Sequence, residues 1–150
     1  MLKIKVKRIH SDALLPIISY EGDAGLDLSS ISDYTVNPGE RCLVKTGIAI
    51  ELPKNTEAQV RPRSGLALKY GITVLNSPGT IDEQYRGEIA VIIINHGNET
   101  CQIKKHDRIA QLIINRLPKI EIIEVKELSI TTRGEGGFGS SGIKPQENLI

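Results

Sequence analysis

An arginine-rich segment, Arg61-Pro62-Arg63-Ser64-Gly65, has the residue types that bind a phosphate group. Ser64 begins a stretch that can form a short helix, and helix N-termini present free N–H groups and a positive dipole end to anions. Because Gly65 has no side chain, a phosphate could approach the backbone closely there. Arginines exposed on an ordinary loop would give the same pattern, so this segment alone only indicates a phosphate site.

Carboxylates occur in two other segments that could serve the same reaction. Residues 76–87 place Asp82 and Tyr85 between Pro-Gly and Arg-Gly turn signals, as expected for a hairpin whose backbone could bind a flat ring. Asp23 and Asp27 lie four residues apart in an apolar-flanked strand and could help to hold a hydrated cation. Each segment has an ordinary alternative, namely a hairpin with an exposed tyrosine and a turn with solvated acids.

The C-terminal segment over residues 131–142 places Arg133 and Phe138 among many glycines. Such segments can form backbone nests that bind anions, although the Gly-Lys-Ser/Thr ending of a Walker A loop is missing. Composition alone favours a disordered tail, whereas the arginine and the aromatic side chain argue for a function. Residues 107–111, with the sequence Asp-Arg-Ile-Ala-Gln, put further polar groups at the mouth of a buried strand.

The elements that must position these residues are mostly strands, because apolar and polar residues alternate along the chain. The predicted strands are short and separated by turn signals, and they span residues 2–9, 34–36, 42–44, 48–52, 58–61, 72–75, 88–95, 109–114 and 120–125. Only the stretch after Ser64 suggests a helix, with Ser64 near its N-cap and Gly71 at its C-terminal end. Many short strands favour an all-β sandwich or barrel, with jelly-roll topology a good candidate.

Length and composition limit the class of protein. The chain has 150 residues, 39% of them hydrophobic and 25% charged, so one domain with an aliphatic core is expected. A formal net charge of +1 argues against a protein that coats nucleic acid through bulk charge. No apolar run approaches the roughly 18 residues that span a bilayer, and the N-terminus lacks the apolar stretch of a signal peptide. Cys42 and Cys101 form neither a disulfide framework nor a zinc motif, so we expect a cytoplasmic protein.

Together, five segments resemble the motifs of the trimeric dUTPase family, in the family's order and spacing: AGLDL, PRSGLA, NSPGTIDEQYRGE, DRIAQL and RGEGGFGSSG. The resemblance implies a jelly-roll-like β-barrel over residues 1–130 and a flexible glycine-rich C-terminal arm over residues 131–150. It implies a homotrimer with shared active sites, in which the arm of one subunit completes a neighbour's site. The implied reaction is hydrolysis of dUTP to dUMP and pyrophosphate with Mg²⁺, which keeps uracil out of DNA and supplies dUMP for dTMP synthesis.

The family's site residues transfer to this chain by position. Asp82 matches the catalytic acid that orients and activates the water attacking the α-phosphate and also contacts the 3′-hydroxyl. Asp27 matches an acid that reaches the metal indirectly, through water. The other matches contact the substrate: Arg63, Ser64, Gly65 and Gln111 at the phosphates, Arg133 at the γ-phosphate, Tyr85 under the deoxyribose, Asn76, Gly79, Thr80, Ile81 and Ala90 in the hairpin that reads uracil, and Phe138 over the base with Gly139 and Ser140 beside it.

One position departs from the family pattern, since His106 stands where a glycine often precedes the Asp-Arg-Ile-Ala-Gln run. If that turn requires a positive φ, histidine tolerates it better than most side chains but not freely. Two other functions compete with hydrolysis. A dCTP deaminase shares the fold and the trimer, but the zinc-deaminase signature H-x-E…P-C-x-x-C is absent from the sequence. A non-enzymatic jelly-roll protein would bind the nucleotide without turnover.

Overall fold

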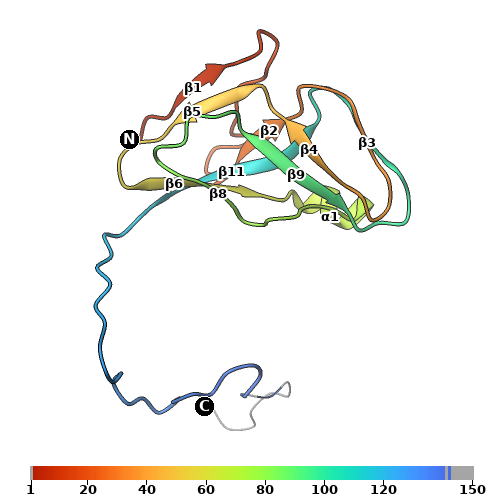
Figure 1. The fold of residues 1–150 in the computed structure, drawn as a ribbon. Coiled ribbons are helices and arrows are strands. Elements are labelled where there is room, and N and C mark those ends of the chain that lie inside the picture. The colour runs from red at the N-terminus through yellow and green to blue at the C-terminus, as the bar shows by residue number, and fades with distance from the viewer. Residues whose placement is uncertain (1, 141, 143–150) are drawn as a thin grey trace. The chain divides into compact units, whose positions relative to one another are not determined.

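The structure is a computed structural model that describes residues 2–140 and 142. Short β-strands form nearly all of its regular secondary structure (Figure 1). The chain divides into two units, Met1–Lys119 and Ile120–Ile150. Every strand and the single helix of the described residues lie in the first unit. The expected all-β class with one short helix is therefore confirmed.

The first unit contains eleven strands among the described residues: β1 Lys5–Arg8, β2 Leu26–Ser29, β3 Tyr34–Val36, β4 Arg41–Lys45, β5 Ile48–Glu51, β6 Thr56–Arg61, β7 Ile72–Val74, β8 Gly79–Ile81, β9 Ala90–Asn95, β10 Cys101–Ile103 and β11 Arg108–Arg116. The predicted strands up to residue 114 each overlap an observed strand, with ends that differ by a few residues. Strands β8 and β10 were not among the predicted strands, and β2 was noted only as the apolar-flanked strand around Asp27.

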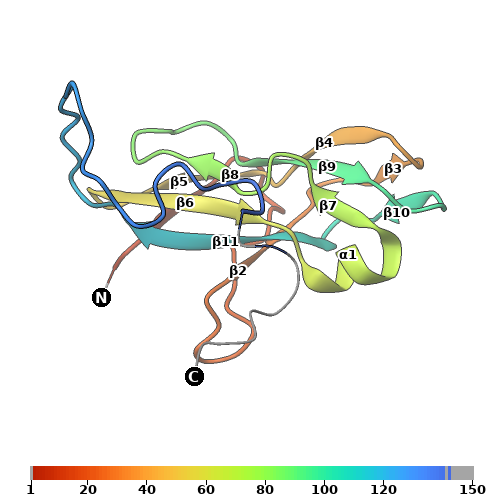
Figure 2. The same cartoon turned by 90° about the horizontal axis from the view of Figure 1, so that it is seen from below.

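Two antiparallel sheets enclose the core. One sheet has the strand order β2-β11-β6-β8 and the other the order β4-β9-β7, while β1 pairs with β5 and β10 with β3. Their inward-facing side chains belong to one aliphatic cluster, which includes Leu28, Val60, Leu112, Val44, Val91 and Ile93. Because residues of both sheets share this core, the unit is a β-sandwich, as the alternating pattern predicted. Figure 2 shows β6 running between β11 and β8 towards the helix.

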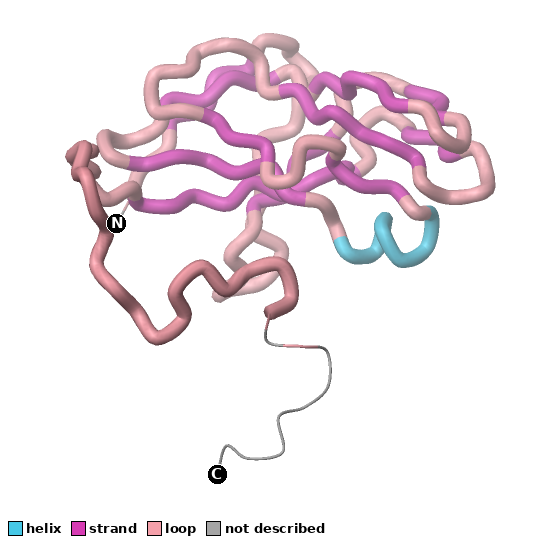
Figure 3. Tube along the Cα trace, turned by 60° about the horizontal axis from the view of Figure 1, so that its bottom comes forward, coloured by secondary structure: helices cyan, strands magenta, loops and turns pink. Residues whose placement is uncertain are grey.

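The helix α1, Ser64–Tyr70, follows directly on β6 and leads into β7 (Figure 3). Its N-cap is Arg63, with φ −97° and ψ 128°, and no side chain caps the helix. Ser64 is the first helical residue and thus lies next to the N-cap, as predicted, although its hydroxyl is not used as a cap. Gly71 ends the helix at φ +67°, as predicted, and a Cβ there would lie 2.5 Å from the backbone nitrogen of Gly97. No helix of the described residues is long and apolar enough to cross a membrane.

The predicted strand over residues 120–125 is wrong. This segment is irregular in the second unit, and its isoleucines are largely exposed, Ile122 at 94% and Ile123 at 70%. Alternating apolar residues form a strand only where a second strand supplies backbone hydrogen-bond partners. No described residue of the second unit belongs to a strand, so the alternating pattern has no partner there.

His106 does adopt the left-handed conformation that its place in the chain suggested, with φ +72°. Its backbone N–H donates to the carbonyl of Ser30 at 2.7 Å, and its ring Nε2 lies 2.9 Å from the carbonyl oxygen of Asp12. The next residue closes the turn, because the Asp107 carboxylate accepts a 2.8 Å hydrogen bond from the backbone of Lys104. These contacts hold the turn that leads into β11 although a histidine replaces glycine.

Neither cysteine is a reactive thiol at neutral pH. Cys42 on β4 and Cys101 on β10 are both partly buried against the core. Burial raises the pKa of both thiols, mainly because the low-polarity surroundings disfavour the thiolate. Both therefore remain protonated and are poor nucleophiles.

Candidate functional site

A partly buried ion-pair network centred on Asp27 joins three of the segments that the sequence singled out. Its carboxylate, whose side chain is 12% exposed, accepts contacts at both oxygens. Oδ1 lies 3.1 Å from Nε of Arg63, and Oδ2 lies 2.9 Å from Nη1 of Arg108. The Ser19 hydroxyl donates a further hydrogen bond to Oδ2 at 3.0 Å. Asp27 therefore ties β2 to the end of β6 and to β11.

Strand register explains why these segments meet. In the four-stranded sheet Gln111 on β11 pairs with Asp27 on β2 and, on its other side, with Arg61 on β6. Residues directly opposite across antiparallel strands have Cβ atoms about 5 Å apart. Asp27, Gln111 and Arg61 therefore lie side by side in one row across the sheet.

The Gln111 side chain is held at the same place by its neighbours. Its Nε2 donates to the carbonyl of Pro62 at 2.9 Å. Gly25 packs directly against this amide, because a Cβ at Gly25 would collide with Gln111 Oε1. A side chain at this glycine of the AGLDL segment would displace the Gln111 amide from that position.

An open cavity of about 700 Å³ lies over this network. Its lining includes Ser64, Gly65, Arg63, Arg108 and Gln111. Two guanidinium groups contact the Asp27 carboxylate here, and Asp23 also lines the cavity, so two positive charges face two carboxylates. Partly buried arginines with spare N–H donors are suited to phosphate oxygens. The cavity can therefore bind an anion such as a phosphate chain.

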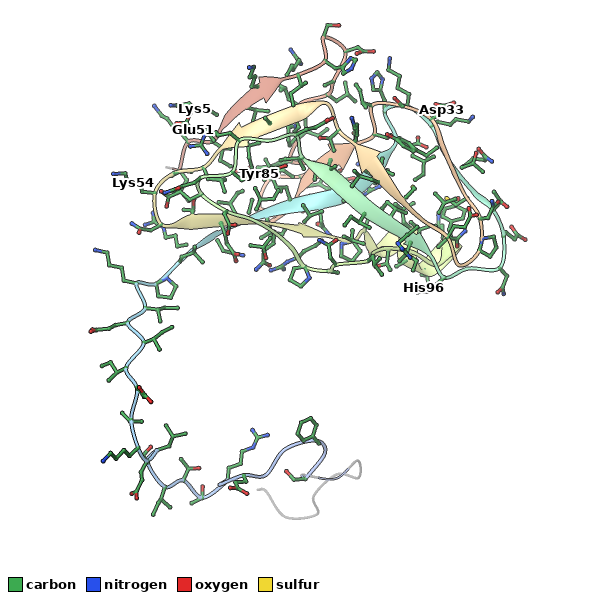
Figure 4. All side chains as sticks on the ribbon, viewed as in Figure 1. Lys5, Asp33, Glu51, Lys54, Tyr85 and His96 are labelled. Carbon is green, nitrogen blue, oxygen red and sulfur yellow. The ribbon has the colours of Figure 1, made fainter. Side chains whose placement is uncertain are left out.

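Asp82 follows β8 and is exposed. The hairpin predicted over residues 76–87 is wrong as a pair of strands, because β8 pairs with β6, whereas β9 pairs with β4 and β7 in the other sheet. The loop that joins β8 to β9 carries Tyr85, which is labelled in Figure 4. Its backbone N–H donates to the carbonyl of Asp82 at 3.0 Å, and its hydroxyl donates to the carbonyl of Glu88 at 3.1 Å. The ring lies so close to Gly87 that any side chain there would collide with it. These contacts order the loop between β8 and β9 and hold Tyr85 beside Asp82.

Other hairpin residues were predicted to read a base. Thr80 is exposed on β8, whereas Gly79 and Ile81 are buried, and Ala90 begins β9. Asn76 lies next to Gly79, since a Cβ at Gly79 would be 3.2 Å from Nδ2 of Asn76. The structure thus brings Asn76, Gly79, Thr80 and Ile81 together on or beside β8.

Asp82 and the arginine cavity lie at different ends of β6 within one chain. Ile81 pairs with Ala58 near the start of β6, and Asp82 continues beyond that pairing. Arg63 lies two residues past the other end. A six-residue strand spans about 17 Å, at about 3.3 Å per residue, so most of this length separates the Cα positions of Asp82 and Arg63.

The glycine-rich segment forms consecutive turns within the second unit. Arg133 Nε donates to the carbonyl of Gly136 at 2.8 Å, and the backbone N–H of Ser140 donates to the carbonyl of Gly137 at 3.0 Å. Phe138 has φ +48° and a fully exposed ring, and Gly139 follows at φ +89°. One short run of turns thus contains four of the predicted site residues, Arg133, Phe138, Gly139 and Ser140.

Sequence reasoning missed two residues of the network. Arg108 was noted as part of the Asp-Arg-Ile-Ala-Gln run without a role, and Ser19 was not considered. The position of Arg108 at the start of a buried strand was an available signal, because a charged residue there must find a partner or solvent. Nothing in the sequence around Ser19 marks it as a site residue.

The acids and histidines of the described residues do not form a cage for a metal, since no group of three His, Cys, Asp or Glu side chains lies close enough together. Both Asp27 oxygens are already engaged by guanidinium and hydroxyl groups. Mg²⁺ keeps several water ligands and prefers phosphate oxygens to a dedicated protein cage. The donor set is therefore compatible with a hydrated cation that a phosphate chain brings with it, and the indirect metal contact of Asp27 stays a prediction.

The fold and the cavity together define an all-β protein with an arginine-lined cavity at the end of its central strands. Comparisons with known proteins specify the class further. A model of the dUTPase family matches residues 11–142. The chain is 59% identical to the deoxyuridine 5′-triphosphate nucleotidohydrolase of Alkaliphilus metalliredigens over 96% of this chain and 100% of that protein. It is 58% identical to the enzyme of the same name from Clostridioides difficile, over 95% of this chain and 99% of that protein. The chain belongs to the dUTPase family.

A solved structure agrees with this assignment. The dUTPase of Staphylococcus bacteriophage 80alpha, determined with dUPNHPP, superposes with a TM-score of 0.87 at 28% identity, and the match covers 94% of this chain and 99% of that chain. The β-sandwich described above is therefore the dUTPase fold, and the resemblance that the five segments indicated is confirmed.

Proposed function

We propose that this chain is a dUTP diphosphatase, which hydrolyses dUTP to dUMP and pyrophosphate. The observation that carries the proposal is the cavity in which two arginines share the single carboxylate of Asp27, because it joins three of the family's motifs into one anion site. The names of the two bacterial relatives and the nucleotide analogue in the phage structure support the same activity.

Phosphate binding is assigned to the cavity. Arg63, Ser64 and Gly65 would hold the phosphate chain together with Gln111, whose amide is fixed by Pro62. Phosphoryl transfer depends on charge neutralisation and in-line positioning more than on covalent help. Mg²⁺ bound to the phosphates would supply further neutralisation, with Asp27 oriented towards it through water.

The attacking water is assigned to Asp82. Its carboxylate is exposed and makes no hydrogen bond to the described residues, so it is free to accept a proton from water. A general base of this kind typically contributes about 10²–10⁴-fold to a rate. Water held by Asp82 would attack the α-phosphorus in line with the leaving pyrophosphate.

Recognition of uracil is assigned to β8 and to the start of β9, which the loop with Tyr85 connects. Backbone groups near Asn76, Thr80, Ile81 and Ala90 would pair with O4 and N3–H of the base, and close approach of the backbone would exclude the 5-methyl of thymine. Tyr85, packed against Gly87, would lie under the deoxyribose and exclude a 2′-hydroxyl. A site that leaves buried polar groups unpaired against the wrong substrate can reject it by roughly 10⁴–10⁵.

The active sites are proposed to be shared within a homotrimer. The separation of Asp82 from Arg63 along β6 supports this, because both groups must act on one nucleotide. Two aliphatic side chains are exposed, Leu43 on β4 at 54% and Leu75 directly after β7 at 46%. Such exposed apolar side chains are consistent with a surface that another copy of the chain covers. The two free cysteines, Cys42 and Cys101, suit a reducing, cytoplasmic compartment.

The proposal is tested by measuring pyrophosphate release from dUTP, dTTP, dCTP and UTP with and without Mg²⁺. We expect dUTP to be hydrolysed at least about 10³-fold faster than the other three, as differential pairing allows, and the rate to fall when Mg²⁺ is removed. Ammonia from dCTP would instead identify a deaminase, and binding of dUTP without turnover would identify a non-enzymatic protein.

The arm over residues 131–150 is proposed to close over the nucleotide bound by another subunit. Phe138 would stack on uracil, with Gly139 and Ser140 beside it, and Arg133 would contact the γ-phosphate. Residues 131–142 could span about 40 Å when extended, at about 3.3–3.6 Å per residue. The structure divides the chain earlier, after Lys119, so residues 120–130 would serve as the connection.

Deleting residues 131–150 tests the role of the arm. We expect turnover at saturating dUTP to fall by about tenfold or more, because a closing segment excludes water and completes the charge on the phosphates. The thermal midpoint should stay within a few degrees, since the arm lies outside the core cluster. Unchanged turnover of the shortened chain would refute the proposed lid.

A further inference from the structure

Arg108 occupies an unassigned place in the phosphate cavity. We infer that Arg108 is a positioning residue, which keeps the guanidinium of Arg63 available to the phosphate chain by occupying one oxygen of Asp27. This inference rests on the proposed function, since it assumes that Arg63 binds phosphate. Asp27, Arg63 and Arg108 would thus be arranged for phosphate binding before the nucleotide binds.

The contacts divide the Asp27 carboxylate between two arginines. Arg63 uses only Nε, which lies 3.1 Å from Oδ1, while Arg108 takes Oδ2 with Nη1 at 2.9 Å. The backbone of Arg108 also holds Arg63, because the Arg108 carbonyl accepts a 3.0 Å hydrogen bond from Arg63 Nη1. Nη2 of Arg63 then has no partner within residues 2–140 and 142, and it belongs to a residue that lines the cavity.

A guanidinium and a carboxylate prefer to pair through two parallel hydrogen bonds. If Oδ2 were vacant, Arg63 could turn and occupy both oxygens of Asp27. Its remaining donor would then face the carboxylate and not the cavity. The side chain of Arg108 prevents this by holding Oδ2, and Ser19 assists because its hydroxyl contacts both Oδ2, at 3.0 Å, and Nη1 of Arg108, at 3.3 Å.

The charge balance leads to the same conclusion. With both arginines present, Arg63 and Arg108 balance the two carboxylates of the cavity lining, Asp23 and Asp27. Without Arg108, Asp27 and Arg63 would neutralise each other, and the charge of Asp23 would be left uncompensated. Since the Arg63 side chain is 28% exposed and Asp27 12%, that pair would be only partly screened by solvent. The cavity would then attract a phosphate chain less strongly.

The test replaces Arg108 with glutamine and measures binding of the non-hydrolysable analogue dUPNHPP and of dUMP. We expect the Kd of the analogue to rise about ten- to hundredfold, as for loss of a charge-assisted hydrogen bond. The Kd of dUMP should change by less than about threefold, because dUMP carries only one phosphate. Arg108→Lys should fall in between, since lysine keeps the charge but not the planar fork. Arg116→Gln, an exposed arginine at the other end of β11, is the control and should leave both constants unchanged.

A double-mutant cycle distinguishes positioning from direct contact. If Arg108 acts through Arg63, then Arg108→Gln should cost less than about threefold in an Arg63→Gln background. Equal losses in both backgrounds, or no loss in the wild-type background, would overturn the inference. If the glutamine variant does not fold, the same cycle is run with Arg108→Lys. Failure of the wild-type chain to bind dUPNHPP would instead refute the proposed function.

Discussion

Replacing Asp82 by asparagine is expected to slow dUTP hydrolysis by about 10²–10⁴-fold, the usual contribution of a general base. Asparagine has nearly the same shape but does not accept a proton from water at neutral pH. Because Asp82 is exposed and makes no hydrogen bond to other described residues, the change should leave the fold intact. Affinity for dUPNHPP should change less than about tenfold, since a group that acts mainly in the transition state contributes little to ground-state binding.

The measurement is single-turnover hydrolysis together with the Kd of the analogue. The neighbouring acid provides a matched control, because the Glu83 carboxylate accepts a 2.6 Å hydrogen bond from the backbone of Asn55 and thus has a structural partner. Glu83→Gln should keep the rate within about threefold, since glutamine can accept the same hydrogen bond. A parallel loss of rate and binding in Asp82→Asn would mean that Asp82 organises the loop after β8 and does not activate water.

Mixing two inactive variants is expected to restore activity if the sites are shared. Asp82→Asn removes the proposed base and Arg63→Gln the proposed phosphate ligand, so each homogeneous protein should be nearly inactive. When equal amounts are unfolded and refolded together, some sites combine an intact Asp82 from one subunit with an intact Arg63 from another. For random mixing, about a quarter of all sites would be complete if each site takes these residues from two different subunits of a cyclic assembly.

This experiment compares the activity of the co-refolded mixture with that of the two variants mixed after separate refolding. Light scattering on the same samples gives the oligomeric state, with a trimer expected. A mixture no more active than its components would show that Asp82 and Arg63 act within one chain, in spite of their separation along β6. A monomer that hydrolyses dUTP would refute the shared site as well.

The local structure was largely predictable from the residues themselves. Two-residue alternation found most strands of the first unit, and Gly71 marked the end of the helix because its left-handed φ suits glycine. The order of the five motifs identified the family. Such signals are readable because each depends on neighbours in the sequence, such as side-chain periodicity, helix ends and turns.

What depends on the tertiary structure is the partner of each residue. The sharing of Asp27 between Arg63 and Arg108 follows from the register of β2, β11 and β6, which no local pattern reports. The isoleucines of residues 120–125 alternate as a strand would, yet they remain irregular, since a strand exists only where another backbone pairs with it. The sequence by itself determined which short elements form and which family they build; the packed sheets decided which charges meet, because hydrogen bonds and ion pairs act over a few ångströms in space and not along the chain.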